Sequence, residues 1–137
     1  APVSPAMHRE WLFSRERKLL QGFGRTEYGC CEPLHDKLPD ALSMPGIVKL
    51  SASPWAQLEK YRDGVPNDVI ISWKPNPAWL AQEFDETFIR TELEKDMRIL
   101  RDKRFEVVLG DLRTCGGHPE RIGRWIQLVR ESMENCL

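Results

Sequence analysis

Residues 67–75 read NDVIISWKP and residues 105–111 read FEVVLGD. Each stretch is an almost continuous apolar run that ends where Pro or Gly residues begin. Between them, residues 84–103 form the longest helical pattern of the chain, acidic at its start and basic at its end, as the helix macrodipole prefers. Strands that are apolar along their whole length are typical of parallel sheets covered by helices. The two stretches therefore predict an α/β fold.

The same strand–helix unit recurs along the chain. Ser4 and Pro5 make a good capped start for a first helix, and Gly22 ends it. The expected elements are helices at residues 4–22, 35–43, 54–64, 84–103 and 119–135 and strands at 25–29, 46–53, 67–75 and 105–111. In the helices, Trp11 and Trp125 are expected in the core and His8 on the surface.

Four parallel strand–helix units fit two architectures. No Gly-x-Gly-x-x-Gly motif follows any of the strands, so a dinucleotide-binding fold has no motif support. The units make either a small open sheet or half of an eight-stranded barrel, whose full form needs about 250 residues. The chain has 137 residues, and the periodicity alone does not choose between the two.

Composition excludes several function classes. Twenty Lys and Arg residues against 21 Asp and Glu residues give a net charge of −1, which argues against nucleic acid as a partner. No apolar run approaches the length of a membrane span, so no membrane contact is expected. Cys30 and Cys31 are adjacent and the four cysteines lack the spacing of a disulfide framework, which favours free thiols and a cytoplasmic location.

Unusual residues gather in the loops that follow the predicted strands. Function in parallel α/β folds is located at the carboxyl ends of the strands. Three cysteines, two histidines and two tryptophans fall in these loops, whereas the loops at the opposite end are ordinary polar turns. The residues that we single out there for binding a substrate are Tyr28, Trp55, Trp73, Lys74, Asn76, Arg113 and His118.

Thiolate, imidazole and carboxylate groups at such an edge are the ligand types of zinc. Cys30 and Cys115, with either Glu32 or His35, could supply three ligands and leave a fourth position for a substrate. The alternative is that the thiols only line a pocket, because no paired Cys-x-x-Cys motif is present.

Positive groups in the same loops point to an anionic ligand. Lys74, Arg113 and His118 would converge above the strand ends, opposed mainly by Glu32 and Asp111. The alternative is that Arg113 pairs with an acidic neighbour and Lys74 reaches the solvent.

Four motifs in order resemble the last part of the uroporphyrinogen decarboxylase-like superfamily, which includes the corrinoid-dependent methyltransferases. They are YGCCEPLHDKL (28–38), VKLSASPWA (48–56), VIISWKPNPAWLA (69–81) and EVVLGDLRTCGGHPERIGRWIQLVRES (106–132). The resemblance covers residues 3–135 and is to an uncharacterised branch. It implies a (β/α) TIM barrel, with these four strands similar to the fifth to eighth. Residues 1–137 would then be a single partial barrel domain, completed by a first half or by a second copy in a homodimer.

The resemblance also implies a chemistry. Zinc-dependent methyltransferases of the superfamily use a His-x-Cys pair after the fifth strand and a Cys after the eighth. Cys30 and Cys115 match the two Cys positions, whereas Tyr28 stands in place of the His. The implied activity is transfer of a methyl group between a corrinoid, carried on a partner protein, and a thiol or small molecule. The alternatives are a non-catalytic ligand-binding half-barrel and a tetrapyrrole decarboxylase.

Overall fold

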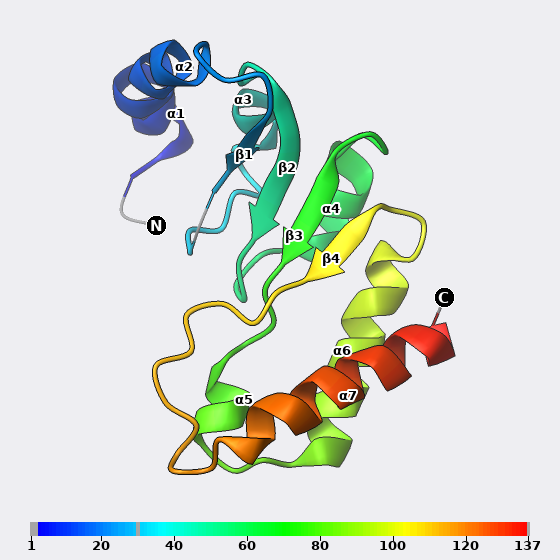
Figure 1. Ribbon diagram of the computed structural model, residues 1–137. Helices are drawn as coiled ribbons and strands as arrows, with labels where there is room; N and C mark the ends of the chain where they lie inside the picture. Colours follow the sequence, from blue (N-terminus) through cyan, green and yellow to red (C-terminus); the bar gives the residue numbers. More distant parts are fainter. Residues whose placement is uncertain (1–2, 30, 137) are drawn as a thin grey trace.

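A parallel four-stranded sheet is the centre of the computed structural model, which describes residues 3–29 and 31–136. Its order is β1-β2-β3-β4, so each strand pairs with the one that follows it in the chain (Figure 1). The strands are β1 (Thr26–Tyr28), β2 (Ile47–Ala52), β3 (Ile70–Trp73) and β4 (Phe105–Val107). The α/β class and the four parallel strands predicted from the sequence are confirmed.

Helices separate the strands and flank the sheet. Figure 1 shows α3 and α4 behind the sheet; α6 packs against α4, and α7 packs against α6. The helical elements are α1 (Pro5–His8), the π-helical turn η1 (Arg9–Phe13), α2 (Ser14–Leu20), α3 (Leu38–Leu42), α4 (Leu58–Gly64), α5 (Ala78–Ala81), α6 (Glu86–Leu100) and α7 (Glu120–Cys136). None of the helices in the described part is both long enough and apolar enough to span a membrane.

The first helical run, made of α1, η1 and α2, begins where the sequence predicts. The face of this run that is buried differs from the predicted one. The Ser4 hydroxyl accepts a hydrogen bond from the Met7 amide at 3.2 Å, and Pro5 occupies the first turn. His8, expected on the surface, is 3% exposed, whereas Trp11, expected in the core, is 51% exposed. Both expectations are wrong because the helix contacts β1 through His8 and Phe13, and no described segment covers its other side.

Several element boundaries also differ from the prediction, two of them at the site edge. The helix expected from residue 54 begins at Leu58, because Gln57 is extended, and residues 54 and 55 form a turn. The strand expected over 105–111 pairs regularly only to Val107; the Val108 amide still donates to the Trp73 carbonyl at 2.8 Å. Beyond it the chain leaves the sheet and reaches Asp111 with a φ of 57°.

The hydrophobic core lies between the sheet and the helices that cover one of its faces. Leu50 and Ile71 of the strands and Leu93, Met97 and Leu128 of the helices are fully buried in it. Trp125 is 4% exposed, which confirms the prediction for this residue. Burial of these side chains holds the helices against the strands.

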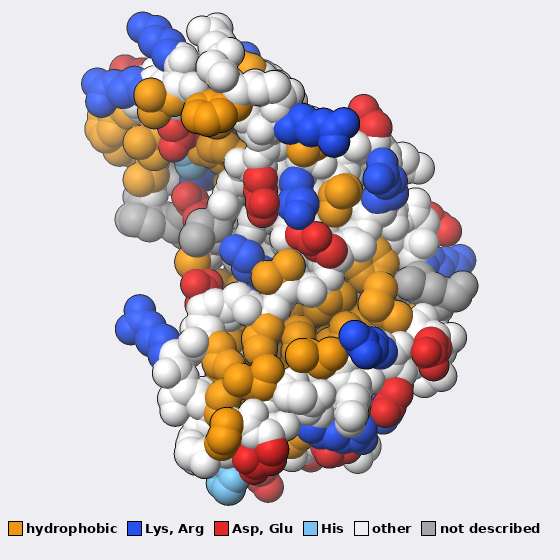
Figure 2. Space-filling view, in the orientation of Figure 1, with side chains coloured by type: hydrophobic (Ala, Val, Ile, Leu, Met, Phe, Trp, Pro, Cys, Tyr) orange, Lys and Arg blue, Asp and Glu red, His pale blue; other side chains and the backbone are white. Residues whose placement is uncertain are grey.

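The other face of the sheet carries charge. The Lys49 ammonium on β2 lies 2.8 Å from the Glu106 carboxylate on β4, across the intervening β3. The Lys49 hydrogen bond lowers the pKa of Glu106, and the Ser72 hydroxyl lowers it further. Figure 2 shows charged side chains of both signs over the strands on this side. This face is therefore polar in its middle.

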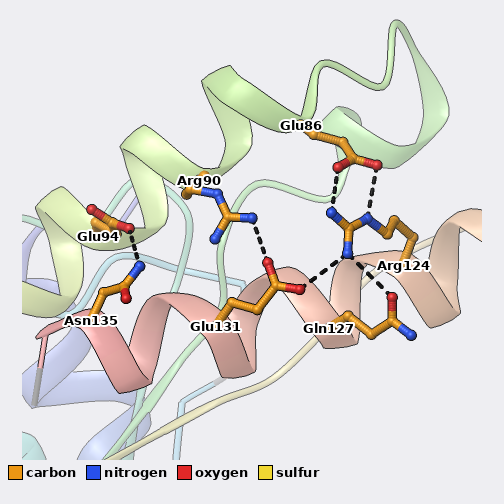
Figure 3. A network of polar contacts seen from close by, with 7 residues as sticks. All are labelled: Glu86, Arg90, Glu94, Arg124, Gln127, Glu131 and Asn135. Carbon is orange, nitrogen blue, oxygen red and sulfur yellow. Dashed lines mark hydrogen bonds and ion pairs between the residues drawn. The ribbon is translucent and has the colours of Figure 1, made fainter.

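Ion pairs tie α7 to α6 (Figure 3). The Arg124 guanidinium donates to both carboxylate oxygens of Glu86, at 2.8 and 2.6 Å, and also reaches Glu131 at 3.2 Å. Arg90 donates to the other oxygen of Glu131, and Asn135 donates to Glu94 at 3.1 Å. The network fixes the register of the two helices above the buried contacts of Trp125, Leu128 and Val129.

Asp96 is a carboxylate without such support. It lies on α6, and its partial burial raises its pKa from 3.8 to about 6. Lys95 opposes this shift, whereas the negative charges of Glu92 and of Glu59 on α4 add to it. The folded state therefore binds this proton more tightly than the unfolded chain does.

Replacing Asp96 removes the free-energy cost of ionising this carboxyl group in the folded state. Because the folded pKa is raised, the stability linked to Asp96 is full below about pH 4 and is lost as the pH rises through about 6. We expect Asp96→Asn to raise the free energy of unfolding by about 1–3 kcal/mol at pH 8 and by much less at pH 4. Urea denaturation at both pH values measures this. Asp102→Asn, at a carboxylate that is 78% exposed, is the control; an equal gain for both variants would contradict the assignment.

Candidate functional site

Two loops that are far apart in the sequence meet at the carboxyl ends of the strands. The Cys31 thiol, after β1, donates a hydrogen bond to Asp111 Oδ2, after β4, at 3.0 Å. Asp111 adopts the left-handed backbone conformation, which Asp tolerates better than most residues. The first and last strand loops therefore approach one another over this edge of the sheet.

The structure brings three of the predicted binding residues together. Trp55, Asn76 and Arg113 line a hollow of about 310 Å³, together with Pro77, Ala78, Ala81, Asp111, Leu112 and Thr114. We call it the loop hollow. Asn76 Oδ1 accepts from the Ala78 amide at 3.0 Å, which fixes the start of α5. Trp55 is 67% exposed and Arg113 is exposed, so both are accessible to a ligand.

Lys74 and Trp73 do not line the loop hollow. The Trp73 side chain is 2% exposed and belongs to the core. The aliphatic stem of Lys74 lies against Gly110, where an added Cβ would come within 2.9 Å of Lys74 Cδ. A glycine at this position gives the lysine room to pass along β4.

A second hollow, which we call the β1 hollow, lies between the first helical run and β1. It measures about 310 Å³ and is lined by His8, Leu12, Glu16, Tyr28, Gly29, Glu32 and Leu34. Tyr28 donates its hydroxyl proton to Glu16 Oε2 at 2.6 Å, and His8 Nε2 lies 3.1 Å from the same hydroxyl oxygen. Burial raises the pKa of Tyr28 well above its usual range, and Glu16 adds to the shift.

His8 is held in place from three sides. Its ring stacks on Phe13 with 4.3 Å between centroids, and its Nδ1 lies 4.0 Å from Glu32 Oε1. Glu32 is also paired with Lys37, which is 3% exposed. Sequence reasoning found Tyr28 and Glu32 but missed His8, Glu16 and Lys37, because their neighbours in the sequence are ordinary helix and loop residues.

The predicted zinc ligands do not gather within the described part. Cys30 lies outside it. His35 accepts at Nδ1 from the Gln57 amide at 3.3 Å, and Glu32 is engaged with Lys37. Among residues 3–29 and 31–136, no three His, Cys, Asp or Glu side chains are arranged to hold a metal ion. The described residues thus do not fit zinc by themselves, and we derive no chemical step through it.

His118 is not among the residues that line the loop hollow. It is exposed, and its Nδ1 lies 3.0 Å from Glu120 Oε1 at the start of α7. The nearby Cys115 is partly buried. Arg121, which the sequence did not single out, donates to the Leu80 and Gln82 carbonyls at 2.9 and 2.8 Å and so holds the last loop against α5.

Tyr61 of α4 joins the loop after β1 to strand β2. Its hydroxyl donates to the Ser51 carbonyl of β2 at 2.9 Å and accepts from the Leu34 amide at 3.3 Å. The side chain is fully buried, and this burial raises its pKa. Gly29 packs close by, where a Cβ would lie 2.8 Å from Leu34 Cδ1.

Searches against protein-family models, curated proteins and solved structures return no match to this chain. The assignment of function therefore depends on the geometry and on the residues themselves.

Removing the Tyr61 hydroxyl takes away its hydrogen bonds to the Ser51 carbonyl and from the Leu34 amide. We expect Tyr61→Phe to lower the free energy of unfolding by about 1–3 kcal/mol and to speed hydrogen exchange at the Leu34 amide. Denaturant unfolding and exchange measured by NMR check both effects. Amides in the middle of β3 are the internal control. Unchanged stability together with unchanged protection of Leu34 would show that the two hydrogen bonds do not support the loops.

Proposed function

We propose that this chain is the second half of a (β/α) barrel of the uroporphyrinogen decarboxylase-like kind, and that the loops after its strands bind a small anionic or thiol-bearing molecule. The observation that carries the proposal is the strand order. Four parallel strands follow one another without a reversal, and α3 and α4 lie on one side of them. A doubly wound sheet has a reversal of strand order and helices on both faces, whereas a barrel has neither.

The two edges of the sheet support the same proposal. Beside β1, the exposed apolar side chains are Trp11, Leu12, Leu19 and Phe23. At the other edge, α7 exposes Ile122 and Ile126, and Figure 2 shows apolar side chains gathered between β4 and α7. A hollow of about 790 Å³, lined in part by Phe105, Met133 and Cys136, opens between the start of β4 and the end of α7. Further strand–helix units would cover these surfaces.

The loops support a binding role at the strand ends. The contact between Cys31 and Asp111 draws the outer loops together, as the mouth of a barrel requires. Arg113 and Trp55 both line the loop hollow, together with apolar residues of the same loops. A cation next to an apolar wall suits a small molecule with an anionic group.

The finer proposal is methyl transfer between a corrinoid on a partner protein and a thiol, which the resemblance of the strand-loop motifs implies. The competing proposal is a half-barrel that binds the ligand without catalysis. Zinc analysis of the chain joined to its upstream half separates the two, because Cys30 and Cys115 would need ligands from outside the described residues. A tetrapyrrole decarboxylase is the third candidate and has the least support from the loop motifs.

Completion of the barrel can be tested on the chain itself. An exposed strand edge flanked by apolar helices favours association. In a dimer, β4 of each copy would pair with β1 of the other, so every strand edge would be hydrogen-bonded. We expect sedimentation equilibrium to show a dimer, or a monomer that gains stability when the upstream half is supplied. The half-barrel would be contradicted if the chain stays monomeric and stable at low concentration and gains no stability from the upstream half.

The ligand class depends on Arg113. We expect Arg113→Gln to weaken binding of mercaptoacetate and sulfate about tenfold, since a charge-assisted hydrogen bond is lost. Calorimetric titration of both forms measures this. Arg130→Gln, at an exposed position on α7, is the matched control. Equal affinities for all three proteins would remove the loop hollow as an anion site.

A further inference from the structure

Beside the β1 hollow lies a buried nitrogen that no described residue satisfies. His8 Nδ1 has no hydrogen bond, although the side chain is only 4% exposed. Such atoms are rare in folded proteins, because a buried polar atom without a partner is costly. His8 lines the hollow, so a partner can come from a bound molecule.

The hydrogen bonds of Tyr28 place a proton on one nitrogen of His8. Tyr28 has one hydroxyl proton and gives it to Glu16 at 2.6 Å. At 3.1 Å from the same oxygen, His8 Nε2 must therefore be the donor. In the neutral ring, Nδ1 then carries a lone pair, and it faces Glu32 Oε1, another acceptor, at 4.0 Å. Glu32 Oε1 already accepts from Lys37, so His8 Nδ1 is the atom that lacks a donor.

The lining of the hollow sets the charge of that donor. Glu16 and Glu32 are both in the lining, and no Lys or Arg is among the lining residues. Lys37 meets Glu32 from outside the lining. Leu12 and Leu34 add apolar walls. A ligand with several N–H donors, a positive charge and a short apolar chain matches this lining.

We propose that the β1 hollow binds a small organic cation that carries a primary ammonium group, whose N–H donors reach His8 Nδ1, Glu16 and Glu32. The site is separate from the loop hollow and has the opposite charge preference, so it does not rest on the function proposed above. Phe13 keeps the His8 ring oriented by stacking on it. Gly29, with a φ of 107°, lets the loop after β1 close over Leu34.

The first test uses three probes on the unmodified chain. Butylammonium has three N–H donors, tetramethylammonium has the charge without donors, and butanol has a similar chain without the charge. We expect saturable binding of butylammonium and at least tenfold weaker binding of the other two, by calorimetry or ligand-observed NMR. Equal binding of the three probes would overturn the proposal. So would the absence of butylammonium binding when this probe is in 50-fold excess over the protein, at a probe concentration on the order of 10 mM.

The second test locates the binding. Glu16→Gln keeps an oxygen that can accept from Tyr28 but removes the charge, and we expect it to weaken butylammonium binding about tenfold or more. Glu10→Gln, at an exposed position of the same helical run, should leave the affinity unchanged. Equal losses of butylammonium affinity in both variants would show that the effect comes from long-range charge, and the proposed site would be wrong.

The third test reads the His8 ring directly and needs no altered binding residue. In chain labelled with ¹⁵N-histidine, we expect His8 Nδ1 to show the shift of an unprotonated nitrogen and to move when butylammonium is added. His8→Gln serves only to assign the signals. A proton found on Nδ1 in the free chain would mean that His8 already donates towards Glu32, and the proposal would be wrong.

Discussion

Parallel pairing of four strands in chain order is the constraint on which the rest of the structure depends. Each strand must be followed by a crossover that returns to the start of the sheet, and such crossovers are right-handed. Repetition of the same step places the crossover helices on one side and the four strand loops at one edge. It also leaves β1 and β4 each with one unpaired edge. The gathering of the strand loops at one edge and the unpaired edges of β1 and β4 thus both follow from the strand order.

Polar contacts then shape the loops at the site edge. The buried Tyr61 hydroxyl, which is removed from water and must find partners, reaches from α4 to Ser51 and Leu34. At the exposed surface, Cys31 reaches Asp111 across the strand ends. What they leave open are two hollows of unlike character, one with Arg113 and one with two glutamates.

Charge also distinguishes the two faces of the sheet. The helix-covered face is apolar, whereas the other face places the Lys49–Glu106 pair across β3. In a closed barrel this second face would point to the interior, and charged side chains there must be paired as these are. On the helical side, the ion pairs of Arg124 lie above an apolar contact that α6 and α7 already make. There the charges set the register of helices that apolar burial holds together.

The sequence by itself determined the α/β class, the number of parallel strands and the edge at which the unusual side chains lie. These follow from local patterns: apolar runs, capped helices and turn residues act over a few positions. Only the tertiary structure decided which loop residues meet. Trp55, Asn76 and Arg113 share a hollow, while Trp73 is in the core and His118 turns to Glu120. His8 shows the reason most clearly. Its neighbours in the sequence are charged, yet it is buried, because Phe13, Tyr28 and Glu32 approach it through the packing of the helix on β1, which no local pattern encodes.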